Sequence, residues 1–264
     1  MENKKKKSNF LMNIVFVIAI GVFAFSGYKI YQIYTNYEAI DNEYETIKEE
    51  FVTEQVVIKD AVETEEDVWQ PVLQVDFDAL LATNADVIGW IHFIEPSTIS
   101  YPVVQTTNND YYLSRSLKKK SLSAGSIFVD YQNDNDFNDE NTVIYGHNMK
   151  NGSMFGQLRK FKKADFCKAN PYFYIYTVDG RELTYQVFAV KIAGATSSTY
   201  DKIYADKEEF QQYLNDVYKN AICTSSDVAV TAEDRIVTLS TCTGDDSTRL
   251  VVFGVVVNEV VIGE

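Results

Sequence analysis

The sequence contains three cysteines and two histidines, and these few residues are its main candidates for nucleophilic and acid–base chemistry. Cys242 ends the β-rich run Ile236–Thr241 and precedes a polar loop. Because side chains alternate along a strand, Cys242 shares a face with the hydroxyls of Thr238 and Ser240. A structural cysteine is more naturally found among apolar side chains. Cys242 is therefore the candidate nucleophile.

A cysteine nucleophile needs a basic neighbour, and acyl transfer also needs a donor for the oxyanion. His147 stands where a strand-like run ends in Gly146 and the sequence turns polar, a position at which a rigid scaffold presents reactive groups. Whether the fold brings His147 to Cys242 across 95 residues is not visible in the sequence. Arg249 precedes the run Leu250–Val257, which we expect to return antiparallel beside the cysteine strand. The Arg249 side chain is either the donor for the oxyanion or a solvent-facing surface residue.

The remaining histidine and cysteines have structural interpretations. His92 lies in the apolar run Gly89–Ile94, which favours a buried role. Cys167 and Cys223 follow amphipathic segments and resemble small buried apolar residues. A disulfide between them remains open, although an odd number of cysteines leaves at least one free thiol.

Composition excludes several classes of protein. The chain is 46% hydrophobic and 14% aromatic, which is incompatible with wholesale disorder. A net charge of −14 argues against nucleic acid as a partner, because phosphates would be repelled. Three cysteines without a CxxC pair exclude a disulfide-dense scaffold and give no sign of a zinc site.

The amino terminus carries a membrane signal. Residues 1–29 have a net charge of +4, whereas the rest of the chain has −18. A basic tail, residues 1–9, precedes the uncharged segment 10–28, which as a helix would span about 28 Å of a bilayer core of ~30 Å. The lysines should stay in the cytoplasm, with the remainder outside the cell. An uncleaved single-pass anchor is favoured over a cleaved signal peptide, since the apolar run is longer than usual.

Residues 29–70 are predicted to form an amphipathic helix followed by an acidic connector. Apolar residues recur at spacings of three and four from Ile30 to Phe51, which is one face of a helix. This face can dock on the protein's own domain, which is favoured, or on a second copy in a coiled coil. The connector, Glu54–Asp67, is acidic and weakly patterned.

From residue 71 to 264 the pattern predicts one mainly β domain. Short helices are expected at Asp76–Asp86 and Asp206–Asn220, the second with Glu209 in a capping box. Seven or eight short strands with few helices suggest a closed or nearly closed β-barrel with helical insertions. The expected strands are Ile99–Val104, Ser126–Val129, Thr142–Tyr145, Tyr172–Val178, Leu183–Ile192, Ile236–Thr241 and Leu250–Val257.

The tract Asp130–Asn141 is dense in Asp and Asn and raises the question of a calcium loop. Asp139 stands where such a loop needs glycine, and Tyr145 stands where it needs glutamate. A solvated acidic loop without metal is therefore the preferred interpretation.

Several ordered motifs resemble the sortase family. Thr238–Cys242 followed by Arg249 is similar to its TLxTC…R signature, and Asn141–Met149 resembles its catalytic-histidine strand. The resemblance runs from about residue 71 to 257 and is closest to class B sortases. The class B features are the Ser in TLSTC, the helix Asp206–Asn220, Gly89–Ile91, Tyr101–Gln105, Tyr111–Leu113 and Gly125–Tyr131.

The resemblance implies a closed eight-stranded sortase-type β-barrel and a cysteine transpeptidase of a Gram-positive cell membrane, with no cofactor. Cys242 would attack a threonine carbonyl in the C-terminal sorting motif of a surface protein and form a thioacyl intermediate. His147 would protonate the leaving amine and later deprotonate a peptidoglycan amine, from a precursor or a cross-bridge. Arg249 would hold the substrate and stabilise the oxyanion.

The resemblance also indicates a substrate groove. Ser240 and the adjacent Thr241 are candidate substrate-binding residues, as are Tyr200 and Tyr204 before the inserted helix. The interval between Cys242 and Arg249 is shorter than class B sortases usually have, which bears on substrate preference.

Three other functions compete with wall anchoring. A pilin-polymerising sortase would differ only in its acceptor, a lysine of another subunit. A membrane-tethered adhesion or scaffold module would use the barrel without catalysis. A papain-like hydrolase would place Cys before His, which is the opposite of the order found here.

Overall fold

The computed structural model describes residues 2–55, 72–225 and 227–262. The chain divides into two compact units, Met1–Glu45 and Thr46–Glu264. The first unit is formed by the helix α1 (Glu2–Phe51). The last residues of this helix, from Thr46 onward, belong to the second unit. The predicted connector lies mostly outside the described residues, but its first part pairs in a small sheet, β1 (Val52–Gln55) with β2 (Val72–Val75).

α1 meets the length and composition of a membrane-spanning helix from Met12 onward. Apolar side chains of the predicted anchor are exposed along it, including Phe16 at 65% and Phe23 at 82%. The predicted helical continuation through residue 51 is confirmed. Of its apolar face, Ile30 and Ile33 are exposed, whereas Ile47 and Phe51 are buried within the second unit.

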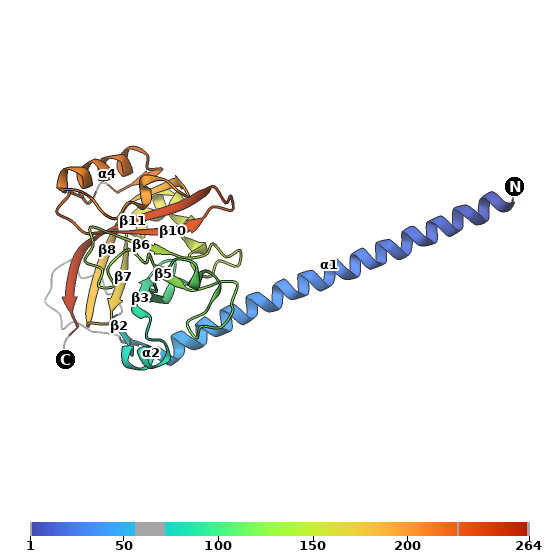
Figure 1. Cartoon of the computed structure of the whole chain (residues 1–264), viewed down its shortest axis with the longest axis horizontal. Helices are drawn as coiled ribbons and strands as arrows, with labels where there is room; N and C mark the ends of the chain where they lie inside the picture. Colours follow the sequence, from blue (N-terminus) through green and yellow to red (C-terminus); the bar gives the residue numbers. More distant parts are fainter. Residues whose placement is uncertain (1, 56–71, 226, 263–264) are drawn as a thin grey trace. The chain divides into compact units, whose positions relative to one another are not determined.

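Eight strands form a closed ring in the second unit (Figure 1). Their order is β11-β10-β6-β5-β4-β3-β7-β8, and β8 pairs with β11 to close the barrel. Closure satisfies the backbone groups that an open sheet edge would leave unpaired. The strands are β3 (Val87–Phe93), β4 (Ser100–Val104), β5 (Ile127–Val129), β6 (Asn141–Tyr145), β7 (Tyr172–Thr177), β8 (Arg181–Gly194), β10 (Ile236–Cys242) and β11 (Thr248–Val261); the two-residue β9 (Cys223–Thr224) adds to β8.

The predicted barrel is confirmed. Each expected strand is present, and its ends differ from the predicted ends by no more than four residues. β3 is the barrel strand that the pattern did not reveal. All seven of its residues are buried, so it lacks the alternation of polar and apolar residues that marks a half-exposed strand. His92 lies within it as a buried residue, its Nδ1 3.2 Å from Ser100 Oγ, in agreement with the predicted structural role.

Helical segments cover parts of the barrel. α4 (Lys207–Lys219) has the predicted cap at Asp206, whose carboxylate accepts from the Glu209 amide. Its buried face, which includes Phe210 and Leu214, packs in one cluster with Phe188 of β8 and Phe253 of β11. The other helices are α2 (Phe77–Thr83), α3 (Ala164–Ala169) and the 3-10 segments η1 (Tyr111–Ser114), η2 (Gly156–Lys162) and η3 (Ser198–Tyr200).

Candidate active site

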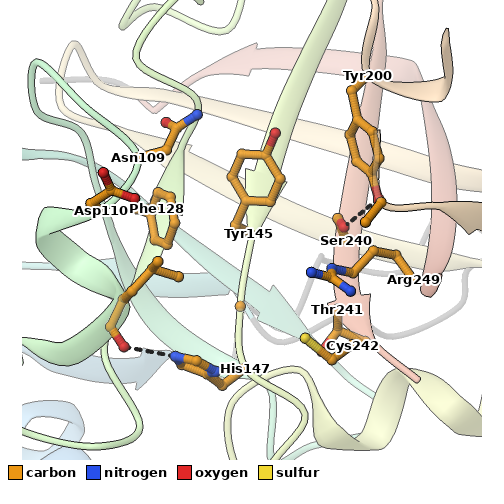
Figure 2. Close-up of a pocket in the computed structure, with 13 residues that line it drawn as sticks. Asn109, Asp110, Phe128, Tyr145, His147, Tyr200, Ser240, Thr241, Cys242 and Arg249 are labelled. Carbon is orange, nitrogen blue, oxygen red and sulfur yellow. Dashed lines mark hydrogen bonds between the residues drawn. The ribbon is translucent and has the colours of Figure 1, made fainter. Parts of the chain in front are cut away.

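Strand pairing brings the predicted histidine and cysteine to one end of the barrel. β6 and β10 are parallel neighbours, with Tyr145 opposite Ser240. His147 lies two residues beyond Tyr145, and Cys242 lies two residues beyond Ser240. Parallel strands end at the same edge, so both side chains emerge together despite their separation in sequence. Both side chains line a pocket of about 440 Å³ and face it from adjacent elements (Figure 2).

Arg249 joins them through the antiparallel hairpin of β10 and β11. Cys242 and Arg249 are directly opposed in its register, which is the antiparallel return expected from the sequence. Arg249 is half-buried in the pocket wall rather than directed away into solvent. Its Nη1 donates to the carbonyls of Asp246 and Thr248, both at 2.9 Å, so the short loop itself orients the guanidinium.

The turn after β6 fixes the position of His147. Gly146 is required there, because a Cβ would come within 2.5 Å of the Ile127 side chain and 2.7 Å of the Phe155 ring. Nε2 of His147 lies 2.7 Å from the carbonyl oxygen of Leu113. A carbonyl oxygen can only accept a hydrogen bond, so Nε2 carries a proton and Nδ1 is the nitrogen left for proton exchange.

The cysteine is tied to the same turn. The Asn148 side-chain amide donates to the carbonyl oxygen of Cys242 at 2.7 Å. This bond joins the residue after His147 to the end of β10. The Cys242 thiol is half-exposed, and Figure 2 shows its sulfur directed toward the side of the pocket that holds His147, with the Arg249 guanidinium near it.

Three of the four predicted substrate-binding residues line the pocket: Ser240, Thr241 and Tyr200. The Tyr200 hydroxyl and Ser240 Oγ are 2.9 Å apart. Burial raises the pKa of Tyr200, while the Ser240 bond and the Arg249 charge act against this rise. Tyr204 lies elsewhere, because its ring packs against Phe210 and Tyr213 and its hydroxyl donates to the Asp201 carbonyl.

The sequence interpretation missed the rest of the pocket wall, which includes Asn109, Leu113, Phe128 and Tyr145. Tyr145 could have been found, since it ends the strand-like run that leads to His147, two residues before the histidine. Asn109 lies in a polar loop without any distinguishing pattern, and only its tertiary contacts place it here.

Asp130 organises this wall from below the surface. Its carboxylate is almost fully buried and accepts from the Asn109 amide and the Tyr145 hydroxyl, both at 2.9 Å. Lys202 Nζ lies 3.4 Å from the same oxygen, which supplies the positive charge that a buried carboxylate needs. Burial and the nearby Asp130 charge raise the pKa of Tyr145, so its phenol stays protonated as a donor. The first residue of the acidic tract thus serves the pocket.

The other two cysteines do not line the pocket. Both are free thiols with 9% of their surface exposed. Cys167 donates to the Phe161 carbonyl at 2.9 Å, and burial together with the adjacent Cys223 raises the pKa of its thiol to about 12. Their predicted structural role agrees with this burial.

The sequence as a whole matches known proteins. The family model of the sortase domain matches residues 94–257. Sortase B of Listeria monocytogenes is 37% identical over 243 residues, which is 90% of this chain and 92% of the relative. The chain belongs to the sortase family.

Solved structures agree with this assignment. A crystal structure of sortase B from Bacillus anthracis has a TM-score of 0.69 at 30% identity, over 84% of this chain and 99% of that one. Sortase B from L. monocytogenes has a TM-score of 0.60 at 40% identity, over 68% and 99%. This sortase is therefore a class B-like cysteine transpeptidase, an enzyme that anchors surface proteins to the cell wall.

Proposed function

We propose that Cys242, His147 and Arg249 carry out the transpeptidation of this sortase. The observation that carries the proposal is their convergence: parallel β6–β10 pairing and the β10–β11 hairpin place all three in one pocket of about 440 Å³. A nucleophile, a proton carrier and a cationic oxyanion donor are the groups that acyl transfer through a cysteine requires.

In the first half-reaction, the Cys242 thiol gives its proton to Nδ1 of His147, and the resulting thiolate attacks the carbonyl carbon of a threonine in the sorting motif of a surface protein. The carbonyl oxygen becomes an oxyanion, and the Arg249 guanidinium stabilises it. Its Nη1 already donates to the loop carbonyls, while its Nε and Nη2 donate no such bond within the described residues and remain available. Pre-oriented donors need no reorganisation as the charge develops.

His147 then transfers the proton. The Leu113 carbonyl keeps Nε2 protonated, so the imidazolium delivers its Nδ1 proton to the leaving amine as the carbon–nitrogen bond breaks. The thioacyl enzyme remains. In the second half-reaction, neutral His147 takes a proton from the incoming peptidoglycan amine, which forms the new amide and releases Cys242.

The sorting peptide occupies the large pocket in this proposal. Ser240 and Tyr200 form one polar wall through their shared hydrogen bond, and Asn109 with Tyr145 forms the other, held by Asp130. Thr241 lies beside the nucleophile. Tyr204 contributes indirectly, by supporting the loop that carries Tyr200 against α4.

The amino terminus completes the proposal. Exposed apolar side chains along α1 need a nonpolar surrounding, and the lysines at positions 4–7 favour a cytoplasmic amino terminus. The segment 10–28 then anchors the enzyme once in the membrane, with the barrel outside. Protease added to intact protoplasts should digest the barrel and spare the first residues; protection of the barrel would contradict this orientation.

The reaction is tested by trapping its intermediate. Full-length enzyme in detergent micelles is mixed with sorting-motif peptides, quenched in acid and digested, and the adduct is located by mass spectrometry. We expect the acyl group on Cys242, and an added amine should convert it into a new amide. An adduct on Cys167 or Cys223, or free acid as the only product whatever amine is added, would contradict the proposal.

A further inference from the structure

A second pocket, of about 90 Å³, shares Thr241 and Cys242 with the large one but has otherwise different walls. Two cations, Arg159 and Lys162, and the side chain of Asn148 line it. The large pocket is assigned to the sorting peptide, so this one is a second cavity beside the same cysteine.

The 3-10 geometry of η2 accounts for the two cations. With three residues per turn, positions three apart lie in line along the segment. Leu158 and Phe161 form one such row and are fully buried, with Phe161 in edge contact with Phe93 of the barrel. The next row, Arg159 and Lys162, is consequently presented together at the surface. The hydrophobic anchor thus fixes where the two charges lie.

These cations are not neutralised by any residue that the structure describes. Among the described residues, neither Arg159 nor Lys162 has an ion pair or a hydrogen bond. The segment 150–168 contains six Lys or Arg residues and one acid, a net charge of +5 in a chain of −14. A local positive field beside the cysteine of an otherwise acidic protein favours an anionic ligand.

Thr241 supplies an independent sign of a ligand. Only 3% of its surface is exposed, and its Oγ1 has no hydrogen-bond partner in the part of the chain that the structure describes. A buried hydroxyl without a partner is unfavourable and is normally satisfied by protein, water or ligand. Thr241 is one of the residues that line the pocket with the two unpaired cations, so a hydroxyl without a partner lies in the same wall.

We propose that this pocket binds a carboxylate of the acceptor, one carried on the same carbon as the attacking amine. Arg159 and Lys162 would pair with the carboxylate and Thr241 would donate to it. A volume of about 90 Å³ suits a group of this size rather than a peptide. The inference rests on the proposed function, because it needs a thioacyl group on Cys242.

The step is an ordinary aminolysis. The amine lone pair forms a carbon–nitrogen bond to the thioacyl carbon, the carbon–sulfur bond breaks, and its electron pair returns to Cys242 Sγ. His147 accepts the proton that the amine loses. The carboxylate takes no part in bond making; it holds the amine at the thioester, which raises the effective concentration of the acceptor.

The test compares D-alanine with D-alaninamide as acceptors, since they differ in the charge of one group. Full-length enzyme in micelles cleaves a sorting peptide, and mass spectrometry gives the ratio of amide to free acid. Both products arise from the same thioacyl enzyme, so the ratio is independent of the rate of acylation.

We expect the double variant Arg159→Gln/Lys162→Gln to lower this ratio about tenfold with D-alanine, the effect of losing charge-assisted hydrogen bonds. With D-alaninamide the ratio should change less than about twofold. Lys168→Gln is the matched control, a cation of the same segment outside the pocket, and should leave both ratios as in the wild type.

Equal losses with both acceptors, or no loss with D-alanine, would overturn the inference. If either result is found while the enzyme still forms an adduct on Cys242 and hydrolyses it to the free acid, the proposed function remains intact. Failure to form that adduct would instead overturn the proposed function.

Discussion

Cys242 and the pair Cys167–Cys223 contain the same chemical group in opposite surroundings. Cys242 is half-exposed at the end of β10, in a pocket with His147 and Arg249. Cys167 is buried beside Cys223, and its thiol donates to a backbone carbonyl. The first environment supplies a proton acceptor and a cation, and the second disfavours the thiolate. The reactivity of each thiol is therefore set by the groups around it.

The comparison predicts its largest effect for Cys242→Ala. Turnover of a sorting peptide should fall by at least about 10³-fold, because no other thiol can reach the pocket. The urea midpoint of the barrel should hardly change, since the lost group is half-exposed. Cleavage of a fluorogenic sorting peptide measures the turnover, and tryptophan fluorescence measures the urea midpoint. If turnover persists in Cys242→Ala and disappears only when Cys167 is also replaced, Cys167 is reactive and the contrast between the exposed and the buried thiols is wrong.

His147→Gln should lower turnover by roughly 10²- to 10⁴-fold, the usual contribution of a general acid–base group. The amide side chain can still donate to the Leu113 carbonyl but cannot shuttle a proton. Single-turnover kinetics should show slow acylation and slow transfer alike. His92→Gln is the control for loss of a histidine; its effect should fall on stability, because His92 is buried and bonded to Ser100.

Arg249→Lys should reduce turnover by about 10²-fold while retaining the positive charge. A lysine lacks the fork that lets one nitrogen bond the loop carbonyls while others face the oxyanion. The loss should appear mainly in kcat, because the interaction strengthens in the transition state. A change confined to KM would indicate that Arg249 only binds the peptide.

The buried pair can be tested by labelling and by pH. In the Cys242→Ala background, iodoacetamide should not modify Cys167 in the folded enzyme at pH 9, although urea-unfolded chain should react readily. Burial raises the pKa of the Cys167 thiol to about 12. A raised pKa stabilises the fold below the unfolded value of ~8.5, and this contribution is lost as the pH rises from there toward 12. Peptide mapping should show the protection of Cys167 from iodoacetamide, and urea titrations should show the loss of stability at high pH. The variant Cys167→Ala should lack this loss of stability.

Tyr200→Phe should have the smallest effect, raising KM for the sorting peptide by a factor of about 2 to 10, as expected for one hydrogen bond. The change removes the bond to Ser240 but keeps the ring beside Tyr145. Tyr204→Phe is the matched control and should leave KM near the wild-type value, because Tyr204 does not line the pocket. Equal effects of the two changes would argue against the assignment of this wall.

Much of the fold could be predicted because it depends on local pattern. The short strands and the Asp206 cap appear where the sequence indicated. β3 escaped because a strand buried on both faces has no alternation. The wall built by Asn109 and Asp130 escaped because it depends on contacts between segments with no shared pattern.

The sequence by itself determined that an apolar segment leads the chain, that the remainder forms short strands, and that Cys242 differs from the other thiols. Each of these follows from composition or from the period of a strand. Only the tertiary structure decided that His147 and Cys242 line one pocket, that Arg249 joins them there, and that Arg159 and Lys162 line a second pocket with the same cysteine. These contacts depend on which strands and segments are neighbours, and in a closed barrel that is settled by the pairing of all eight strands together rather than by any local signal.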